Sequence, residues 1–209
     1  MTSLLKRLSA CAITFLACAS ISAGADLKSA ESAYEQKNFA SAFEEFKPLA
    51  EQGNAEAQLY LGKMYMMGQG VLKDQDQAAK WFKASASQGN ADAQFFLGAY
   101  YLLPHRNIPE GVKWLRLSAD QGQQDAQLLL GKSYLQGDKD LPRDPVQAEM
   151  WLSLAAKNNL DFYQKELVGA EAAMTPEQIS QGKALATSWK PKAANASASK
   201  TTAQSERQN

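Results

Sequence analysis

A repeated pattern organises most of this 209-residue sequence. An Ala-Gln pair occurs at Ala57, Ala93 and Ala126, so successive copies are 36 and 33 residues apart. Each pair precedes a Leu-Gly pair, then a Tyr, and later a Trp followed by an apolar residue; the tryptophans are Trp81, Trp114 and Trp151. A period of this length is typical of repeat proteins, in which each unit buries its apolar face only by stacking on its neighbours. We therefore expect a stack of units instead of one compact core.

The first half of each copy predicts a helix, which we call helix A. In the first copy Ala57, Leu61, Met64 and Tyr65 recur at helical spacing. Gly62 lies among them, and a residue without a side chain leaves room for another backbone to approach closely.

The second half predicts a second helix, helix B, which begins seven residues before each Trp. A capping residue stands there in every copy, at Asp74, Asn107 and Asp144, and a Gln or Glu follows three residues later. This spacing predicts a capping box, in which the two side chains each bond to the other residue's backbone N–H. We expect helix B to end at a left-handed residue, which would be Gly89, Gly122 or the Asn158-Asn159 pair.

Further segments flank the three copies. The predicted organisation comprises a signal peptide (1–25), a degenerate leading helix pair (26–53), three repeats (54–159, divided as 54–89, 90–122 and 123–159), C-terminal capping helices (160–190) and a disordered tail (191–209). Thr175 and Gln178 predict another capping box at the start of the last helix. The tail contains no large apolar residue, which favours disorder.

The first 25 residues have the pattern of an export signal. Lys6 and Arg7 precede a short uncharged apolar run, and Ala23-Gly24-Ala25 supplies the small residues of a cleavage site, so we expect cleavage before Asp26. The run is shorter than the roughly 20 residues that span a bilayer, which argues against stable membrane insertion. We expect a periplasmic or secreted protein, with a lipoprotein modified at Cys18 as the alternative.

Charge and cysteine content exclude some other classes. Lys and Arg together number 22, as do Asp and Glu, so no basic excess favours nucleic acid as a partner. Both cysteines, Cys11 and Cys18, lie within the signal segment. The mature chain would therefore contain no thiol, disulfide or thiolate metal ligand.

The repeated pattern, A-x-A-Q-x-x-L-G-x-x-Y followed by Gly, Asp, Ala and Trp, resembles Sel1-like repeats, which are relatives of tetratricopeptide repeats. The resemblance covers 54–159, and Gly68-Gln69-Gly70-Val71 matches the family's loop between helices A and B. The second copy has a loop three residues shorter, and the third carries Gln124 where Ala55 and Ala91 stand. The resemblance implies an all-α, right-handed α-α superhelical solenoid that acts as an adaptor for protein partners, commonly in the bacterial envelope.

We expect no enzymatic activity, cofactor or metal. His105 is the only histidine, which removes the usual acid–base pair and most zinc sites. Ser180 and Lys183 have the spacing of a serine-lysine pair, but the S-D-N and K-T-G motifs of β-lactam-binding enzymes are missing. A serine-type enzyme that interacts with β-lactams is therefore the least favoured alternative.

One side of helix A is a candidate binding surface. At about 100° per residue, Tyr60 and Met67 lie together beside Glu56, away from the packed face of Leu61. The equivalent residues in the other two copies are Phe96, Leu103 and Asp92, and then Leu129, Gln136 and Asp125. Because helix A lines the concave surface of tetratricopeptide-like stacks, these residues could form an apolar groove edged by carboxylates. The alternative is that they only fill the space between adjacent helices.

Two functional classes follow from these observations. One is an adaptor that binds a protein or peptide in this groove, with Phe96 as the central anchor. The other is a structural or assembly subunit of an envelope complex, which would associate through its end helices. Peptide binding in the groove favours the first class, and association through the ends favours the second.

The cleavage site gives the first testable prediction. The intact mass of the exported protein should correspond to a chain that begins at Asp26. A mature form that begins at a lipid-modified Cys18 would contradict this, and substitution of Cys18 by Ser gives the control.

Overall fold

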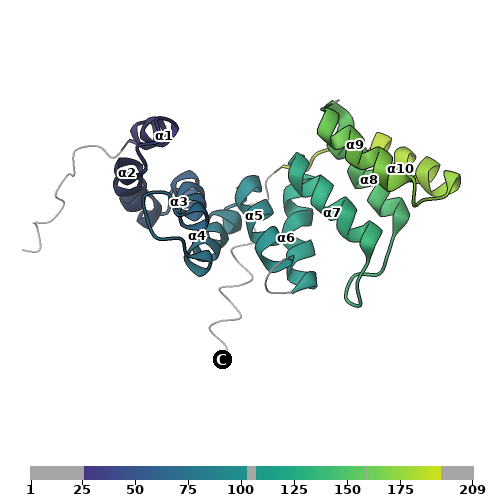
Figure 1. The fold of residues 1–209 in the computed structure, drawn as a ribbon, viewed down its shortest axis with the longest axis horizontal. Coiled ribbons are helices and arrows are strands. Elements are labelled where there is room, and N and C mark those ends of the chain that lie inside the picture. The colour runs from purple at the N-terminus through teal and green to yellow at the C-terminus, as the bar shows by residue number, and fades with distance from the viewer. Residues whose placement is uncertain (1–25, 103–106, 159, 194–209) are drawn as a thin grey trace, which may run out of the picture.

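A computed structural model describes residues 26–102, 107–158 and 160–193. These residues form helices and no β-strand, in an elongated stack that runs from α1 at one end to α9 and α10 at the other (Figure 1). The helices are α1 (Leu27–Glu35), α2 (Phe39–Glu51), α3 (Ala55–Met67), α4 (Gln75–Ser87), α5 (Ala91–Leu102), α6 (Ile108–Asp120), α7 (Gln124–Gln136), α8 (Pro145–Ala155), the 3₁₀ turn η1 (Ala156–Asn158), α9 (Asp161–Glu171) and α10 (Pro176–Ser188). The predicted all-α superhelical solenoid is confirmed.

The helices form consecutive A–B pairs. The pairs are α1–α2, α3–α4, α5–α6 and α7–α8, and each also packs on the pair that follows. The three repeats thus correspond to α3 through α8. The predicted signal peptide lies outside the described residues.

The Gln of each Ala-Gln pair fixes helix A to the helix B before it. Its side-chain amide donates a hydrogen bond to a main-chain carbonyl at the end of that helix, eight residues upstream. The bonds are Gln58 to Ala50 (3.0 Å), Gln94 to Ala86 (3.1 Å), Gln127 to Ala119 (3.1 Å) and Gln164 to Ala156 (2.7 Å). Since α9 makes the fourth bond, it occupies the position of a helix A although its sequence lacks most of the pattern.

The glycine of helix A makes room for a side chain of helix B within the same pair. A Cβ added at Gly62 would lie 2.5 Å from the ring of Phe82. At Gly98 and Gly131 it would lie 2.8 Å and 2.7 Å from Leu115 and Leu152. The residue after each Trp therefore sits directly on the glycine, and the close neighbour that we expected to be backbone is mainly a side chain.

The last helix A ends the series. In α9 the position of this glycine is taken by Val168, whose surface is 63% exposed. A valine side chain there fills the space that the apolar residue of the next helix B would need. The following helix, α10, packs instead on α8.

Helix B begins where the sequence predicts, but the caps differ in one respect. Asp74, Asn107 and Asp144 each accept a hydrogen bond from the first turn. In the described part of the chain, however, the Gln or Glu does not bond back to the cap. The N–H of each cap donates to the carbonyl of the repeated Tyr near the end of helix A, at Tyr65, Tyr101 and Tyr134 (2.9–3.0 Å). That carbonyl satisfies the donor and holds the two helices together. At Thr175 the full capping box is present.

The ends of helix B follow the prediction in two copies. Gly89 and Gly122 have φ values of +95° and +91°. In the third copy η1 ends the helix, and Asn158 does not have the left-handed conformation that we predicted. The 3₁₀ turn satisfies the last carbonyls by a different route, while Asn159 lies outside the described residues.

The tryptophans contribute unequally to the core. Trp114 and Trp151 are 6% and 2% exposed. Trp81 is half-buried against the hydrophobic cluster that contains Phe46 and Leu61. The most deeply buried aromatic side chain of the first repeat is Phe82. The repeated tryptophan is therefore fully buried only in the second and third copies, at Trp114 and Trp151.

Gln124 departs from the repeat pattern, and its side chain replaces a hydrogen bond that the third copy lacks because Ala155 stands in place of a serine. In the first two copies a helix B hydroxyl, of Ser85 or Ser118, donates to the main-chain carbonyl of Ala55 or Ala91 at 2.6 Å. The third copy has Ala155 in place of the serine, and the Gln124 amide donates to the Ala155 carbonyl at 2.8 Å. The bond reverses direction, and the two helices stay joined.

α10 covers a buried carboxyl group. A Cβ added at Gly182 would lie 2.4 Å from the Glu149 side chain, which is fully buried. Ser153 donates to one Glu149 oxygen at 2.7 Å, while the other oxygen has no hydrogen-bond partner in the described part of the chain. Burial raises the pKa of Glu149, which Ser153 partly offsets.

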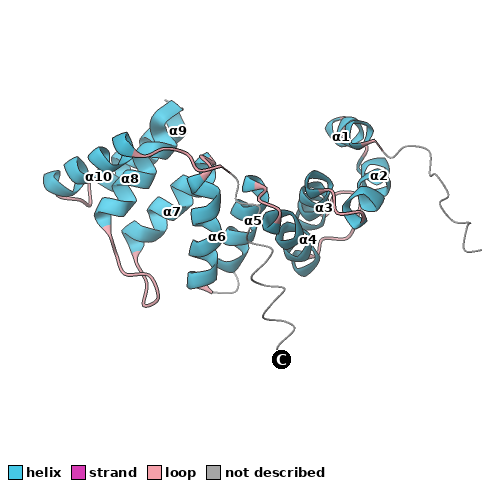
Figure 2. Cartoon of the chain, turned by 180° about the vertical axis from the view of Figure 1, so that it is seen from behind, coloured by secondary structure: helices cyan, strands magenta, loops and turns pink. Residues whose placement is uncertain are grey.

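The segment after α10 returns across the stack to α6, as Figure 2 shows from behind. The Lys192 ammonium pairs with Asp120 at 2.7 Å, and its backbone N–H donates to the Asp120 carbonyl. The tail that we predicted from residue 191 is therefore held at its beginning, and residues 194–209 lie outside the described part.

The buried glutamines give a stability prediction. Gln94→Ala should lower the free energy of unfolding by about 1–3 kcal/mol, because it removes a buried amide that donates to the Ala86 carbonyl and accepts from the Gln121 amide. Gln181→Ala, at an exposed position of α10, is the control and should change it by less than about 0.5 kcal/mol. Urea unfolding followed by circular dichroism measures the free energy of unfolding of both variants. Equal losses in the two variants would contradict the role that we assign to the Gln94 amide.

Glu149 gives a pH-dependent prediction. Because folding raises its pKa, the stability that the protonated group contributes is complete below a pH of about 4 and is lost as the pH rises through the folded-state pKa. Glu149→Gln should therefore melt at a higher temperature than the wild type at neutral pH. The difference should shrink towards pH 4, and a difference that is constant with pH would count against a titrating Glu149.

Candidate functional site

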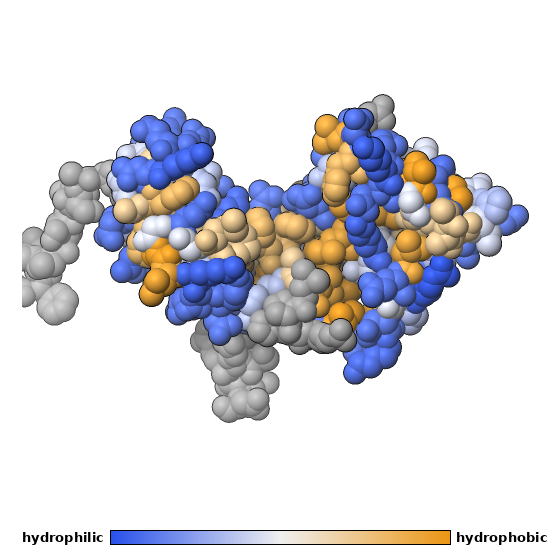
Figure 3. Space-filling view, viewed as in Figure 1, coloured by the Kyte–Doolittle hydropathy of each residue, from blue (hydrophilic) through white to orange (hydrophobic). Residues whose placement is uncertain are grey.

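The predicted surface residues follow the solvent-facing side of the A helices. On α3 they are Glu56, Tyr60 and Met67, and Lys63 lies on the same side. The molecular surface is hollowed between the α1–α2 end and the α9 end, and apolar residues gather below this hollow, over the central part of the stack (Figure 3). We call the side of α3, α5 and α7 that carries Glu56, Tyr60 and Met67 and their equivalents the helix A face.

The two aromatic residues of this face pack against the preceding helix B. Tyr60 stacks on Phe46, with ring centroids 4.5 Å apart and planes 8° from parallel. Phe96 stacks in the same way on Phe82, at 4.9 Å and 15°. Both remain half-buried. They therefore fill the junctions between units and also leave part of their surface exposed, so both of the interpretations that we considered apply in part.

The other apolar positions are less uniform. Leu129 is half-buried against the hydrophobic cluster that contains Leu130 and Trp151, and Met67 is 61% exposed. Leu103 lies outside the described residues. The apolar part of the helix A face is thus best defined at Tyr60, Met67 and Phe96.

Two lysines join adjacent A helices on this face. The Lys63 ammonium lies 5.2 Å from the centroid of the Tyr60 ring and 5.7 Å from that of Phe96, both within the range of cation–π attraction. The equivalent Lys132 pairs with Glu166 of α9 at 2.6 Å. Sequence reasoning missed both lysines, although Lys63 stands three residues after Tyr60 on the same side of the helix.

The carboxylates bond to the next unit. Glu56 accepts from the Asn90 amide at 3.1 Å, and Asp92 from the Gln123 amide at 3.4 Å. Asp125 accepts from the Tyr163 hydroxyl at 2.7 Å, and this hydrogen bond, together with burial, raises the pKa of Tyr163 to about 12. These groups therefore join successive helix A termini in addition to edging the surface.

The residues considered for catalysis do not form a serine-lysine pair of the required kind. Such a pair needs a neutral lysine as the base. Lys183 instead forms an ion pair with Glu171 at 2.7 Å, and the hydrogen bond to Glu171 raises its pKa. A protonated Lys183 cannot accept a proton from Ser180.

Within the described ranges, no three His, Cys, Asp or Glu side chains lie where they could hold a metal ion, and no helix is long and apolar enough to cross a membrane. His105 lies outside these ranges.

A family model described as Sel1 repeat matches this chain three times, over residues 55–90, 91–123 and 124–160. Each match contains one A–B pair, α3–α4, α5–α6 or α7–α8. No functionally curated protein matches the sequence.

Solved structures with the same arrangement include two bacterial proteins. One is a protective antigen of uropathogenic Escherichia coli strains that displays an SLR fold, with a TM-score of 0.63 and 29% identity over 72% of this chain and 34% of the antigen. The other is a Sel1 repeat protein from Oxalobacter formigenes, with a TM-score of 0.62 and 28% identity over 68% of this chain and 59% of its own. This chain therefore spans about a third of the antigen and somewhat more than half of the second protein.

Proposed function

This chain belongs to the Sel1 repeat family, and we propose that it is a non-enzymatic adaptor that binds a protein or peptide partner on the helix A face. Sel1 repeats are protein-interaction modules as a rule, and solenoids present extended curved surfaces for that purpose. The partner would lie along α3 and α5, where Tyr60, Lys63 and Phe96 are adjacent.

The observation that carries this proposal is the aromatic and cationic cluster where α3 meets α5. Partly exposed aromatic residues surrounded by packed neighbours are typical of binding hot spots. Phe96 has such surroundings, because Phe82 and Phe95 support its ring and Lys63 lies over it. An apolar side chain of a partner would extend this stack.

We place the adaptor in the periplasm. The basic start, the short apolar run and Ala23-Gly24-Ala25 support export, and a mature chain without thiols suits an oxidising compartment.

A specific observation favours the second candidate function, an assembly subunit. On α9, Phe162 and Val168 are 57% and 63% exposed. Large apolar residues at the end of a stack are suited to association with another protein. Association there would leave the helix A face free.

Met67 and Leu72 form a matched pair for testing the adaptor proposal. Both are exposed, at 61% and 91%, but only Met67 lies on the helix A face. A photo-reactive residue at position 67 should crosslink a partner in the periplasm, and one at position 72 should not. Capture of the same proteins from both positions would contradict the proposal.

The same pair gives a quantitative prediction for the captured partner. Met67→Asp should weaken its binding roughly thirtyfold, the effect of losing about 2 kcal/mol at a hot spot, while Leu72→Asp should leave the affinity within about threefold. The free energy of unfolding of both variants should stay within about 0.5 kcal/mol of the wild-type value, since both residues are exposed. Calorimetry with the purified partner measures the affinities. Loss only after substitutions at Phe162 would favour assembly through α9 instead.

A further inference from the structure

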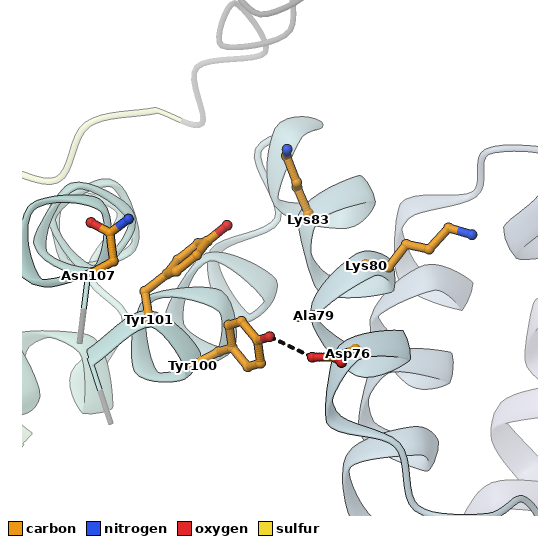
Figure 4. A pocket seen from close by; sticks show the side chains of 7 residues that line it. All are labelled: Asp76, Ala79, Lys80, Lys83, Tyr100, Tyr101 and Asn107. Atoms are coloured by element: carbon orange, nitrogen blue, oxygen red, sulfur yellow. Dashed lines mark hydrogen bonds between the residues drawn. The ribbon is translucent and has the colours of Figure 1, made fainter. Parts of the chain in front are cut away.

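A cleft of about 460 Å³ lies between α4 and α5, and its lining includes none of Tyr60, Lys63, Met67 and Phe96 of the helix A face. Its walls are Asp76, Ala79, Lys80 and Lys83 of α4 and Tyr100 and Tyr101 of α5, with Asn107 at one end (Figure 4). Lys83 and the Tyr101 hydroxyl point to the same opening, whereas Lys80 extends away from the tyrosines. The small side chain of Ala79 leaves the space between these walls open.

The electrostatics of this cleft favour an anionic group. Among the described residues of its lining the only carboxylate is Asp76, which accepts a hydrogen bond from the Tyr100 hydroxyl at 2.9 Å. Burial and this hydrogen bond raise the pKa of Tyr100 to about 12. Neither the Lys83 ammonium nor the Tyr101 hydroxyl has a hydrogen-bond or ion-pair partner in the described part of the chain. Two donors that have no partner among the described residues therefore face the opening.

At the α6–α7 junction the residues at the same positions are in contact with each other. Arg116 and Tyr134 of α6 and α7 stand where Lys83 and Tyr101 stand in the preceding unit. The Arg116 guanidinium donates to the Tyr134 hydroxyl and also lies 5.6 Å from the centroid of its ring. Tyr134 is 9% exposed as a result, whereas Tyr101 is half-buried. The α4–α5 junction therefore has a basic residue and a tyrosine at the same positions as the α6–α7 junction, but without their mutual contact.

The third helix B shows that this surface can accept a peptide segment. Val146, Glu149 and Ser153 of α8 are the equivalents of Asp76, Ala79 and Lys83. On α8 this surface is covered by α10, whose Gly182 lies against the Glu149 side chain and the Val146 carbonyl. A segment that approaches through a small residue thus fits the corresponding surface of a helix B.

We propose that the α4–α5 cleft is a second binding site, which takes an acidic peptide segment with its carboxylate between Lys83 and Tyr101. The carboxylate receives hydrogen bonds from the Lys83 ammonium and the Tyr101 hydroxyl, and a small residue beside it lies over Ala79. The site goes beyond the proposed adaptor face, since the two surfaces share no residue of their linings. A partner or a second protein can occupy it independently.

Selection of random peptides displayed on phage against the exported protein tests this proposal. Peptides that bind the wild type but not Lys83→Ser should carry an Asp or Glu, and synthetic copies with that residue changed to Asn or Gln should bind about tenfold more weakly. Tyr101→Phe, which keeps the ring and removes the hydroxyl, should weaken the same peptides. Lys28→Ser, at an exposed position of α1, is the matched control and should change nothing.

The remaining outcomes separate the two sites. Peptides lost with Met67→Asp and retained with Lys83→Ser bind the helix A face, which supports the adaptor proposal and not the cleft. The cleft proposal is overturned if no Lys83-dependent peptide is selected, or if such peptides lack acidic residues. It is also overturned if inorganic phosphate alone displaces them at millimolar concentration, since that would indicate a general anion site.

Discussion

The hydrogen bond from the buried glutamine of helix A to the end of the preceding helix B determines how the units of this protein stack. A buried amide without an acceptor is unfavourable, so this bond favours one position of each helix A along the end of the preceding helix B. With that height fixed, Glu56 meets Asn90 and Lys63 meets Phe96. Every contact between units on the solvent-facing side therefore depends on a bond inside the stack.

The sequence predicts the parts of this structure that depend on local order. Helix starts, glycine-terminated ends and the period of the solenoid follow from residues a few positions apart, as at Asp74 and Gly89. Contacts between units could not be predicted in the same way, because they depend on the relative height and rotation of two helices. The pairing of the Asp74 N–H with the Tyr65 carbonyl is one such contact. The position of Lys63 over Phe96, which changes the character of the candidate surface, is another.

The three helix B surfaces show how one structural position acquires different uses in a repeat protein. Position 83 and its equivalents carry Lys, Arg and Ser. The arginine closes its junction against Tyr134, the serine supports a buried carboxyl group beneath α10, and the lysine remains at an open cleft. Because the three residues stand at the same place on helix B, these differences follow from the side chains and from what packs on each helix. Divergence of this kind can add binding sites to a solenoid without altering its stacking.

Val168 also bears on how such a protein changes its length during evolution. Duplication of an internal segment of one period, upstream of α9, would insert a new pair whose glycine receives its own helix B and whose glutamine bonds to the pair before it. Duplication that began at α9 would copy a valine into that position and interrupt the array. Gene rearrangements in this lineage should therefore vary the number of central units and preserve the final three helices as one block.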